Sequence, residues 1–272
     1  MRSVKFFIAA GAATLMSSAA FAADMAIAPP PYAPPVVEDF GGWYLRGDIG
    51  FSNQSVKRLD HPLYSDPAIV SHVTNGLGFD TAGIFGLGAG YRFNNWFRAD
   101  VTGEYRGNAN LHGVDIIDYG AGGIIPDEYR GSKSEWLVLA NAYVDLGTWW
   151  CVTPFVGAGI GGSRNTISNF TDVNVPMASV LTGPNASKWN FAWALHAGLA
   201  YQVTPSLTLE LAYRYVDLGD GVSGPFTAYD GSRTYDPMTF KGITSHDLKL
   251  GVRWNLDSPQ PVYAPPPLIR KG

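Results

Sequence analysis

Residues 97–106 alternate between polar and apolar side chains with a period of two. Arg98, Asp100 and every second residue up to Arg106 are polar, and the residues between them are apolar or glycine. In a helix these charges would spread around the whole cylinder and leave no apolar stripe to bury. In a β-strand they all lie on one face. The segment is therefore predicted to be a strand with one charged face and one apolar face.

Seven further segments between Trp43 and Leu256 show the same alternation, and helix signals are nearly absent there. The segment at 152–163 is rich in glycine, which weakens a strand. We predict eight strands, at about 43–51, 81–93, 96–106, 134–146, 152–163, 189–202, 207–216 and 243–256.

The connections between these strands alternate in length. Three are short turns, and four are long loops of roughly 25 residues rich in Gly, Asp, Asn and Pro, whereas a compact soluble domain seldom tolerates one structureless loop that long. The turns lie at 94–95, 147–151 and 203–206, and the loops at 53–80, 107–133, 164–188 and 217–242. This layout is typical of bacterial outer-membrane barrels. The predicted fold is all-β: an eight-stranded antiparallel up-and-down transmembrane β-barrel with four long extracellular loops and short periplasmic turns.

Composition agrees with a surface that does not all face water. Only 15% of the residues are charged, against roughly a quarter in soluble domains. The net charge of -4 supplies no basic stripe for a nucleic-acid partner. The single cysteine, Cys151, excludes a disulfide within the chain and a multi-cysteine zinc site.

The N-terminus has the pattern of a secretory signal peptide. Arg2 and Lys5 precede an apolar stretch at 6–16, and small residues at Ala20 and Ala22 flank Phe21. Cleavage is predicted between Ala22 and Ala23. The mature chain then opens and closes with proline-rich segments, which contain APPPYAPP and PVYAPPPL and favour an extended, hydrated conformation. The predicted organisation is a signal peptide at 1–22, a periplasmic segment at 23–42, the barrel at 43–256 and a periplasmic tail at 257–272.

The two faces of the strands define the interior. A Lys or Arg facing lipid at the bilayer midplane costs about 2–4 kcal/mol, so the charged faces are predicted to point into the barrel. Eight strands enclose about the space that side chains can fill. A lone charge sealed there would cost several kcal/mol, whereas paired charges are tolerable. We therefore predict an ion-pair network that closes the lumen, made of seven basic and seven acidic residues: Arg46, Arg92, Arg98, Arg106, Arg214, Lys249, Arg253, Asp48, Asp100, Glu104, Glu135, Asp145, Glu210 and Asp247.

Three stretches carry a family resemblance: TPFVGAGIGG at 153–162, WNFAWALHAGLAYQVTPSLTLELAYRY at 189–215 and SHDLKLGVRWNL at 245–256. Together with the signal peptide and the eight strands, they resemble the small outer-membrane β-barrels of Gram-negative bacteria. This is the porin-like and opacity-like group that shares the architecture of the OmpA and OmpX barrels. The resemblance covers about 43–256 and is weak in the long loops.

The resemblance implies location in the lipopolysaccharide-containing outer membrane and assembly by the barrel-assembly machinery. Its assembly signal corresponds to Lys249, Gly251, Trp254 and Leu256 in the last strand. The family usually ends at that last hydrophobic residue, whereas 16 residues follow Leu256 here. The proline-rich segments, being periplasmic, are candidates for contact with peptidoglycan.

The predicted function is non-enzymatic. A structural, surface-exposed barrel would contribute to envelope integrity and offer its loops for adhesion or for recognition by host or phage ligands. The alternatives are a narrow porin-like channel and the binding of haem or another small ligand at the loops. Candidate haem ligands are His61, His72 and His112, which lie in the first two long loops.

Two other classes fit the sequence less well. In an enzyme, Ser245 and His246 would have to face one site, but neighbours in a strand point to opposite faces. His196 is predicted to point inward without an accompanying Ser or Cys motif, and no catalytic, cofactor or metal site is predicted. A secreted lipocalin-like barrel would need a charged, Lys-rich exterior, but the chain contains seven lysines.

Overall fold

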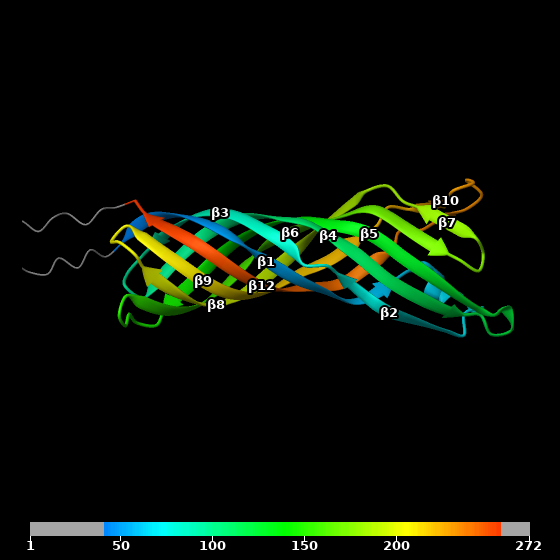
Figure 1. The fold of residues 1–272 in the computed structure, drawn as a ribbon, viewed down its shortest axis with the longest axis horizontal. Coiled ribbons are helices and arrows are strands. Elements are labelled where there is room, and N and C mark those ends of the chain that lie inside the picture. Colours follow the sequence, from blue (N-terminus) through cyan, green and yellow to red (C-terminus); the bar gives the residue numbers. More distant parts are fainter. Residues whose placement is uncertain (1–40, 257–272) are drawn as a thin grey trace, which may run out of the picture. The chain divides into compact units, whose positions relative to one another are not determined.

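The computed structural model describes residues 41–256, which form a closed β-barrel (Figure 1). The predicted signal peptide, its cleavage site at Ala22 and Ala23, and nearly all of the two proline-rich segments lie outside the described residues. Eight antiparallel strands form the ring: β1 (Gly42–Asp60), β3 (Ala82–Arg92), β4 (Phe97–Asp118), β5 (Ile124–Asp145), β6 (Val152–Asn174), β8 (Ala186–Gln202), β9 (Leu207–Val222) and β12 (Thr239–Asn255).

Each ring strand pairs with its neighbour in the chain, and the ring closes where β1 pairs with β12. Tyr44 is opposite Asn255 in this closing ladder. The predicted eight-stranded up-and-down barrel is thereby confirmed. Residues 41–256 contain no helix long and apolar enough to span a membrane.

The two ends of the barrel differ. At one end, called here the short-turn end, tight turns join β3 to β4, β5 to β6 and β8 to β9. The turn between β5 and β6 holds Trp150 and the exposed Cys151 with positive φ angles of 49° and 67°. The opposite, long-loop end carries two single-turn 3-10 helices and four short strands: η1 (Pro62–Ser65), η2 (Gly120–Gly122), β2 (Ser71–Phe79), β7 (Ser179–Thr182), β10 (Phe226–Ala228) and β11 (Thr234–Tyr235).

The ring strands run further into the long connections than predicted. β1 continues to Asp60, β4 to Asp118 and β6 to Asn174, and β5 begins at Ile124. The reason is that the alternation continues with opposite polarity. At Asn110, Leu111 and His112 the polar residues are exposed and the leucine is buried. Strands that stand in water have polar exteriors, and their Gly, Asp and Asn content resembles that of loops.

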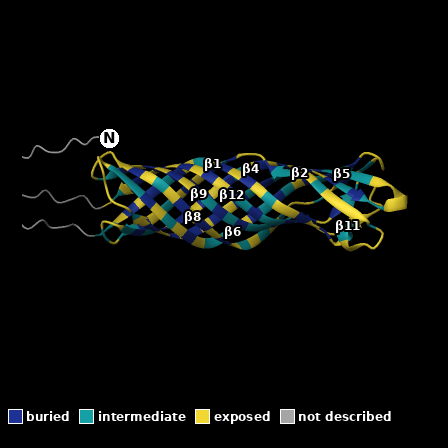
Figure 2. Cartoon of the chain, turned by 90° about the horizontal axis from the view of Figure 1, so that it is seen from below, coloured by how far each residue is buried: buried dark blue, intermediate teal, exposed yellow. Residues whose placement is uncertain are grey.

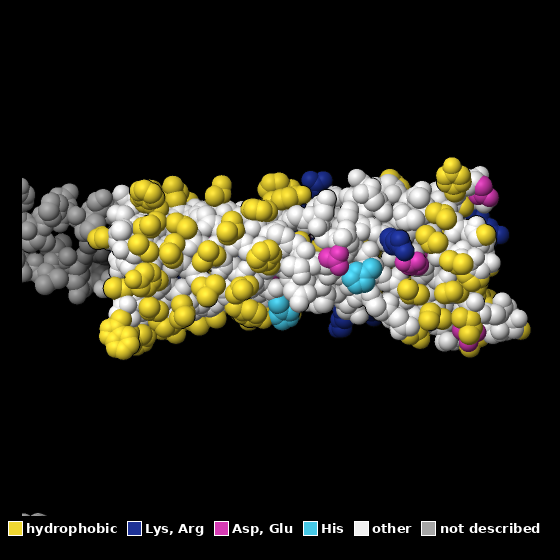
Figure 3. Space-filling model, in the orientation of Figure 1, with side chains coloured by type: hydrophobic (Ala, Val, Ile, Leu, Met, Phe, Trp, Pro, Cys, Tyr) yellow, Lys and Arg dark blue, Asp and Glu magenta, His cyan; other side chains and the backbone are white. Residues whose placement is uncertain are grey.

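The barrel therefore has two zones of opposite polarity. Near the short-turn end the exposed side chains are apolar, and the interior holds ionised groups. Towards the long-loop end the interior is apolar, with Leu111, Ile167, Phe170 and Phe240 in one buried cluster. Figure 2 shows buried and exposed residues alternating along the strands. In Figure 3 apolar side chains gather over the short-turn half, and charged ones lie over the other half.

Aromatic side chains mark both edges of the exposed apolar belt. At the short-turn edge the Trp43 and Tyr91 rings lie 5.3 Å apart. At the other edge Tyr105 lies 5.1 Å from Trp136, and Trp193 lies 5.5 Å from Tyr215. Aromatic girdles of this kind occupy the two interfaces of a bilayer. The belt therefore defines the lipid-facing zone.

A charge placed within the belt tests this assignment. Leu87 is 75% exposed and lies between the two girdles on β3. We expect Leu87→Arg to lower the free energy of unfolding in lipid vesicles by about 2–4 kcal/mol, because a guanidinium group there would enter hydrocarbon. The measurement is urea unfolding followed by tryptophan fluorescence.

The matched control is Ser55→Arg, which places the same side chain outward on β1 beyond the belt. Its expected cost is below about 1 kcal/mol. Equal costs for the two variants would contradict the position of the belt.

Candidate functional site

The lumen of the lipid-facing zone contains one connected network of ion pairs. Thirteen of the fourteen residues predicted to line the lumen belong to it, and Lys133 joins them. The network contains Arg46, Asp48, Arg98, Asp100, Glu104, Arg106, Lys133, Glu135, Asp145, Glu210, Arg214, Asp247, Lys249 and Arg253. With seven basic and seven acidic groups, its formal charge is zero.

The network has its centre at Glu104. This carboxylate lies 2.6 Å from Nη2 of Arg214 and 2.5 Å from Nζ of Lys249. Arg214 also contacts Asp247 at 2.8 Å, and Asp247 contacts Arg106. Three ring strands, β4, β9 and β12, thus meet at this one group of charges.

A second hub lies nearer the short turns. The guanidinium group of Arg46 contacts Asp48 at 2.8 Å, Asp100 at 2.9 Å and Glu210 at 3.2 Å. The hydroxyl group of Tyr143 accepts a further hydrogen bond from Arg46 at 3.2 Å. Lys249 contacts Asp48 at 3.5 Å and thereby connects this hub to Glu104.

Glycines on the inner faces make room for these side chains. A Cβ atom at Gly86 would lie 2.8 Å from Cγ of Glu104, and one at Gly251 would lie 2.6 Å from Oδ1 of Asp48. Any larger residue at either position would displace a charged partner. The glycines that weaken these strands locally are therefore part of the packing of the lumen.

Arg92 and Lys133 differ from the sequence prediction. Arg92, the last residue of β3, is partly exposed at the short-turn end and makes no ion pair within residues 41–256. The sequence pattern predicts a long loop at Lys133, whereas this residue is buried on β5 and contacts Glu135 and Gln54. Its place two residues before Glu135, on the same face of the strand, was the signal that could have found it.

The four residues of the assembly signal divide between the two faces of β12. Lys249 and Gly251 point into the lumen, whereas Trp254 and Leu256 are more than half exposed on the outside. The last strand thus has the same alternation as the rest of the lipid-facing zone. Its recognition by the assembly machinery stays a prediction.

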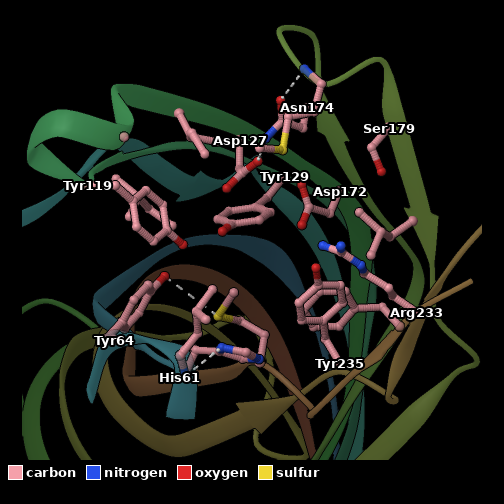
Figure 4. Close-up of a pocket in the computed structure, with 18 residues that line it drawn as sticks. His61, Tyr64, Tyr119, Asp127, Tyr129, Asp172, Asn174, Ser179, Arg233 and Tyr235 are labelled. Carbon is pink, nitrogen blue, oxygen red and sulfur yellow. Dashed lines mark hydrogen bonds between the residues drawn. The ribbon is translucent and has the colours of Figure 1, made fainter. Parts of the chain in front are cut away.

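Between the network and the long-loop end, the interior of the barrel opens into a cavity of about 370 Å³. The cavity is lined by residues of η1, β5, β6 and β11 and by the segments around them. Figure 4 shows Tyr64, Tyr119, Tyr129 and Tyr235 around it, with Asp127 and Asp172 among them. The sequence analysis does not predict this site, because its residues come from all four of the connections predicted to be loops.

Three carboxylates lie at or beside this cavity, and their hydrogen bonding is unequal. Asp115 accepts hydrogen bonds from Tyr64 at 2.6 Å and Thr74 at 3.1 Å, and Asp127 accepts one from Asn174 at 2.7 Å. Asp172 is 6% exposed, and its Oδ1 atom has no hydrogen-bond partner.

Burial shifts the protonation of two of these groups. Burial, together with the neighbouring carboxylates of Asp127 and Asp115, raises the pKa of Asp172 to about 7. Burial also raises the pKa of Asp127 to about 6, partly offset by the hydrogen bond from Asn174. Both carboxyl groups therefore titrate close to neutral pH.

The structure does not bring the three candidate haem histidines together. Nδ1 of His61 accepts a hydrogen bond from the Leu63 amide, and its Nε2 lies 2.9 Å from the Asp236 carbonyl, so both ring nitrogens are engaged. His72 stacks on Tyr64 at 4.1 Å. His112 is on β4, five residues from the partner of His72 in the ladder with β2. Within the described range, no group of three or more His, Cys, Asp or Glu side chains has the arrangement of a metal site.

Ser245 and His246 point to opposite faces of β12. Ser245 is buried and donates to Asp247 at 2.6 Å, whereas His246 is exposed and lies 2.6 Å from the Tyr213 hydroxyl group. His196 is buried in the lumen, 3.1 Å from the side-chain oxygen of Asn141. Ser245 and His246 therefore cannot act on one substrate.

A family model described as an outer membrane protein beta-barrel domain matches residues 8–255. The chain belongs to this family. The barrel is therefore an outer-membrane protein of a Gram-negative bacterium, with its short turns in the periplasm and its long-loop end outside the cell.

Relatives in several bacteria share most of the length of the chain. An uncharacterized protein of Brucella abortus is 29% identical over 271 residues, which cover 87% of this chain and 93% of the relative. Outer membrane protein PagN of Salmonella typhimurium is 30% identical over 222 residues, 78% of this chain and 89% of its own. A putative adhesin of Rickettsia conorii is 25% identical and covers 79% of this chain and 82% of its own.

Among solved structures, Neisserial surface protein A is 19% identical with a TM-score of 0.40, and the match covers 78% of this chain and 96% of that protein. Ail, the attachment invasion locus protein of Yersinia pestis, is 15% identical with a TM-score of 0.34 and coverages of 79% and 98%.

Removing one charge from the centre of the network tests how much the network contributes to the stability of the barrel. Glu104→Gln leaves Arg214 and Lys249 without their main partner in a sealed interior. We expect the free energy of unfolding to fall by about 3–5 kcal/mol, as for other broken buried ion pairs. Urea unfolding in vesicles measures this.

Glu128→Gln is the control, because Glu128 lies on the outside of β5 and pairs with the exposed Arg130 at 2.7 Å. Its expected cost is below about 1 kcal/mol. If Glu104→Gln lowered the free energy of unfolding by as little as the control does, the network would not be a main contributor to the stability of the barrel.

The cavity carboxylates make the extracellular half sensitive to pH. Asp127 and Asp172 bind a proton more tightly in the folded state than in the unfolded chain. Their contribution to stability is therefore complete below about pH 4 and is lost as the pH rises through 6 and 7. We expect hydrogen exchange at the outer ends of β5 and β6, corrected for the intrinsic effect of pH, to show less protection at pH 8 than at pH 5.

Asp172→Asn should reduce this difference, because an amide does not titrate. Protection that is unchanged by the substitution, or that increases with pH, would contradict the assignment.

Proposed function

We propose that this protein is a non-enzymatic barrel whose lumen is closed to solutes and whose functional surface is its extracellular end. The observation that carries the proposal is the neutral ion-pair network. Its central groups, Glu104, Arg106 and Arg214, are at most 1% exposed. A chain that fills its lumen with paired charges has no path for solutes of appreciable size, so its role lies in the membrane and at the cell surface.

The extracellular end offers a surface for contact. Large apolar side chains are exposed beyond the lipid belt, where they face water. They are 62–91% exposed: Val70, Ile124, Val175, Met177 and Tyr229. Exposed apolar groups gathered on a surface mark sites of protein or membrane contact. The Rickettsia relative is named a putative adhesin, which supports adhesion as the use of this end.

Conductance distinguishes the closed barrel from a narrow channel. We expect the refolded protein in planar bilayers to produce no steps above the baseline of lipid alone. Glu104→Gln, which unbalances the network, is the comparison variant. Regular steps from the wild-type protein would favour the channel and contradict a closed lumen.

Adhesion is tested by displaying the protein on the surface of a bacterial strain that does not itself adhere to epithelial cells. We expect the triple variant Ile124→Ser, Val175→Ser and Tyr229→Ser to lose most of its binding to epithelial monolayers, because these side chains supply the apolar contact area. The control is a triple alanine variant at Ser55, Thr166 and Ser187, which lie on the outer wall of the same half. Equal binding by both variants would remove the loop tips as the contact surface.

Cleavage at Ala22, assembly through the last strand and contact between the proline-rich segments and peptidoglycan remain predictions. Haem binding finds little support in the geometry, because His61 has no free ring nitrogen.

A further inference from the structure

Asp172 is a buried carboxylate without a partner at the wall of the extracellular cavity. No hydrogen bond or ion pair is formed by its side chain within residues 41–256, and its Oδ1 atom is inaccessible to solvent. The neighbouring Asp115 and Asp127 both have hydrogen-bond donors. Leaving a desolvated carboxylate unpaired is costly, so the position calls for a donor that the chain itself does not supply.

The rest of the cavity wall is suited to a cation. Four tyrosines and Phe226 line it, and Phe226 stacks on Tyr235 with ring centroids 5.6 Å apart. The faces of aromatic rings attract cations, and their apolar surface accepts an aliphatic chain. In Figure 4, Asp127 and Asp172 lie among these rings.

The charges around the cavity leave an acidic excess. Asp127 on β5 and Asp172 on β6 line it, and Asp115 on β4 lies behind Tyr64. Among residues 41–256, Arg233 is the one Lys or Arg in the lining. Arg233 is exposed and makes no ion pair with Asp172. Both ring nitrogens of His61 are engaged in hydrogen bonds with backbone groups.

We propose that this cavity binds a small alkylammonium ion, whose N–H groups donate to Asp172 and Asp127 while its carbon chain lies against the tyrosine rings. The volume of about 370 Å³ is at the small end of the range for ligand sites. A metal ion fits less well, because calcium takes six to eight oxygen ligands and most residues of the wall are aromatic or aliphatic. An aliphatic diamine such as cadaverine has the required size and chemistry.

Binding is expected to tighten as the pH rises. The carboxyl groups of Asp127 and Asp172, whose pKa values are raised by burial, become acceptors only when they lose their protons. Arg233 and His61 also line the cavity, and Asp115 lies behind Tyr64, so the pH profile is interpreted against the Asp172→Asn variant.

The test uses the full refolded protein in detergent micelles and isothermal titration with cadaverine. We expect saturable binding that is at least tenfold tighter at pH 8 than at pH 5. Asp172→Asn should weaken it at least tenfold at pH 8 without impairing folding, because it removes an unpaired charge. Tyr119→Leu, which keeps the charge and removes one ring, should weaken it several-fold.

Three controls make the result decisive. Glu128→Gln removes a carboxylate next to Asp127 that lies on the outside of the strand, and should leave binding unchanged. The uncharged 1,5-pentanediol should not bind, and tetramethylammonium, which has no N–H donor, should bind more weakly than cadaverine. Equal affinity of the wild type and Asp172→Asn, or equal affinity for cadaverine and pentanediol, would overturn the proposal.

Discussion

Ionised side chains inside a lipid-embedded barrel must neutralise one another, and this constraint organises the rest of the structure. The charged faces of the ring strands can point only inward, because hydrocarbon surrounds the exterior. Once inside, each charge needs a partner within the same narrow space. The connected pairs around Glu104 and Arg46 meet that need, and the glycines at 86 and 251 provide the space for it.

Outside the membrane the same strands meet a different solvent, and their polarity reverses. The interior becomes apolar around Phe170 and Phe240, and the exterior becomes polar. Lys133 lies at the junction, with its ammonium group bound to Glu135 on one side and 5.5 Å from the ring of Phe79 on the other. The chain thus combines a membrane barrel with a water-facing barrel on one continuous set of strands.

The membrane half could be predicted from the sequence, because an apolar exterior with a charged interior gives a clear period of two. Residues 97–106 show it with almost no exceptions, and the faces assigned there agree with the structure. The water-facing half was harder to predict. At residues 57–59, for example, the polar exterior has the composition of a loop, and a strand there is revealed only by its partners in the sheet. The cavity could not be predicted, because Tyr64, Asp172 and Tyr235 are far apart in the sequence and meet only through pairings of that half.

The closing ladder between β1 and β12 places the first and last ring strands side by side, with Tyr44 opposite Asn255. The first and last ring strands therefore pair as any two neighbouring strands of the ring do, and closure of the ring does not depend on which strand comes first in the chain. A circularly permuted gene that joined residues 42 and 255 and opened the ring at the turn near Cys151 would encode the same cylinder.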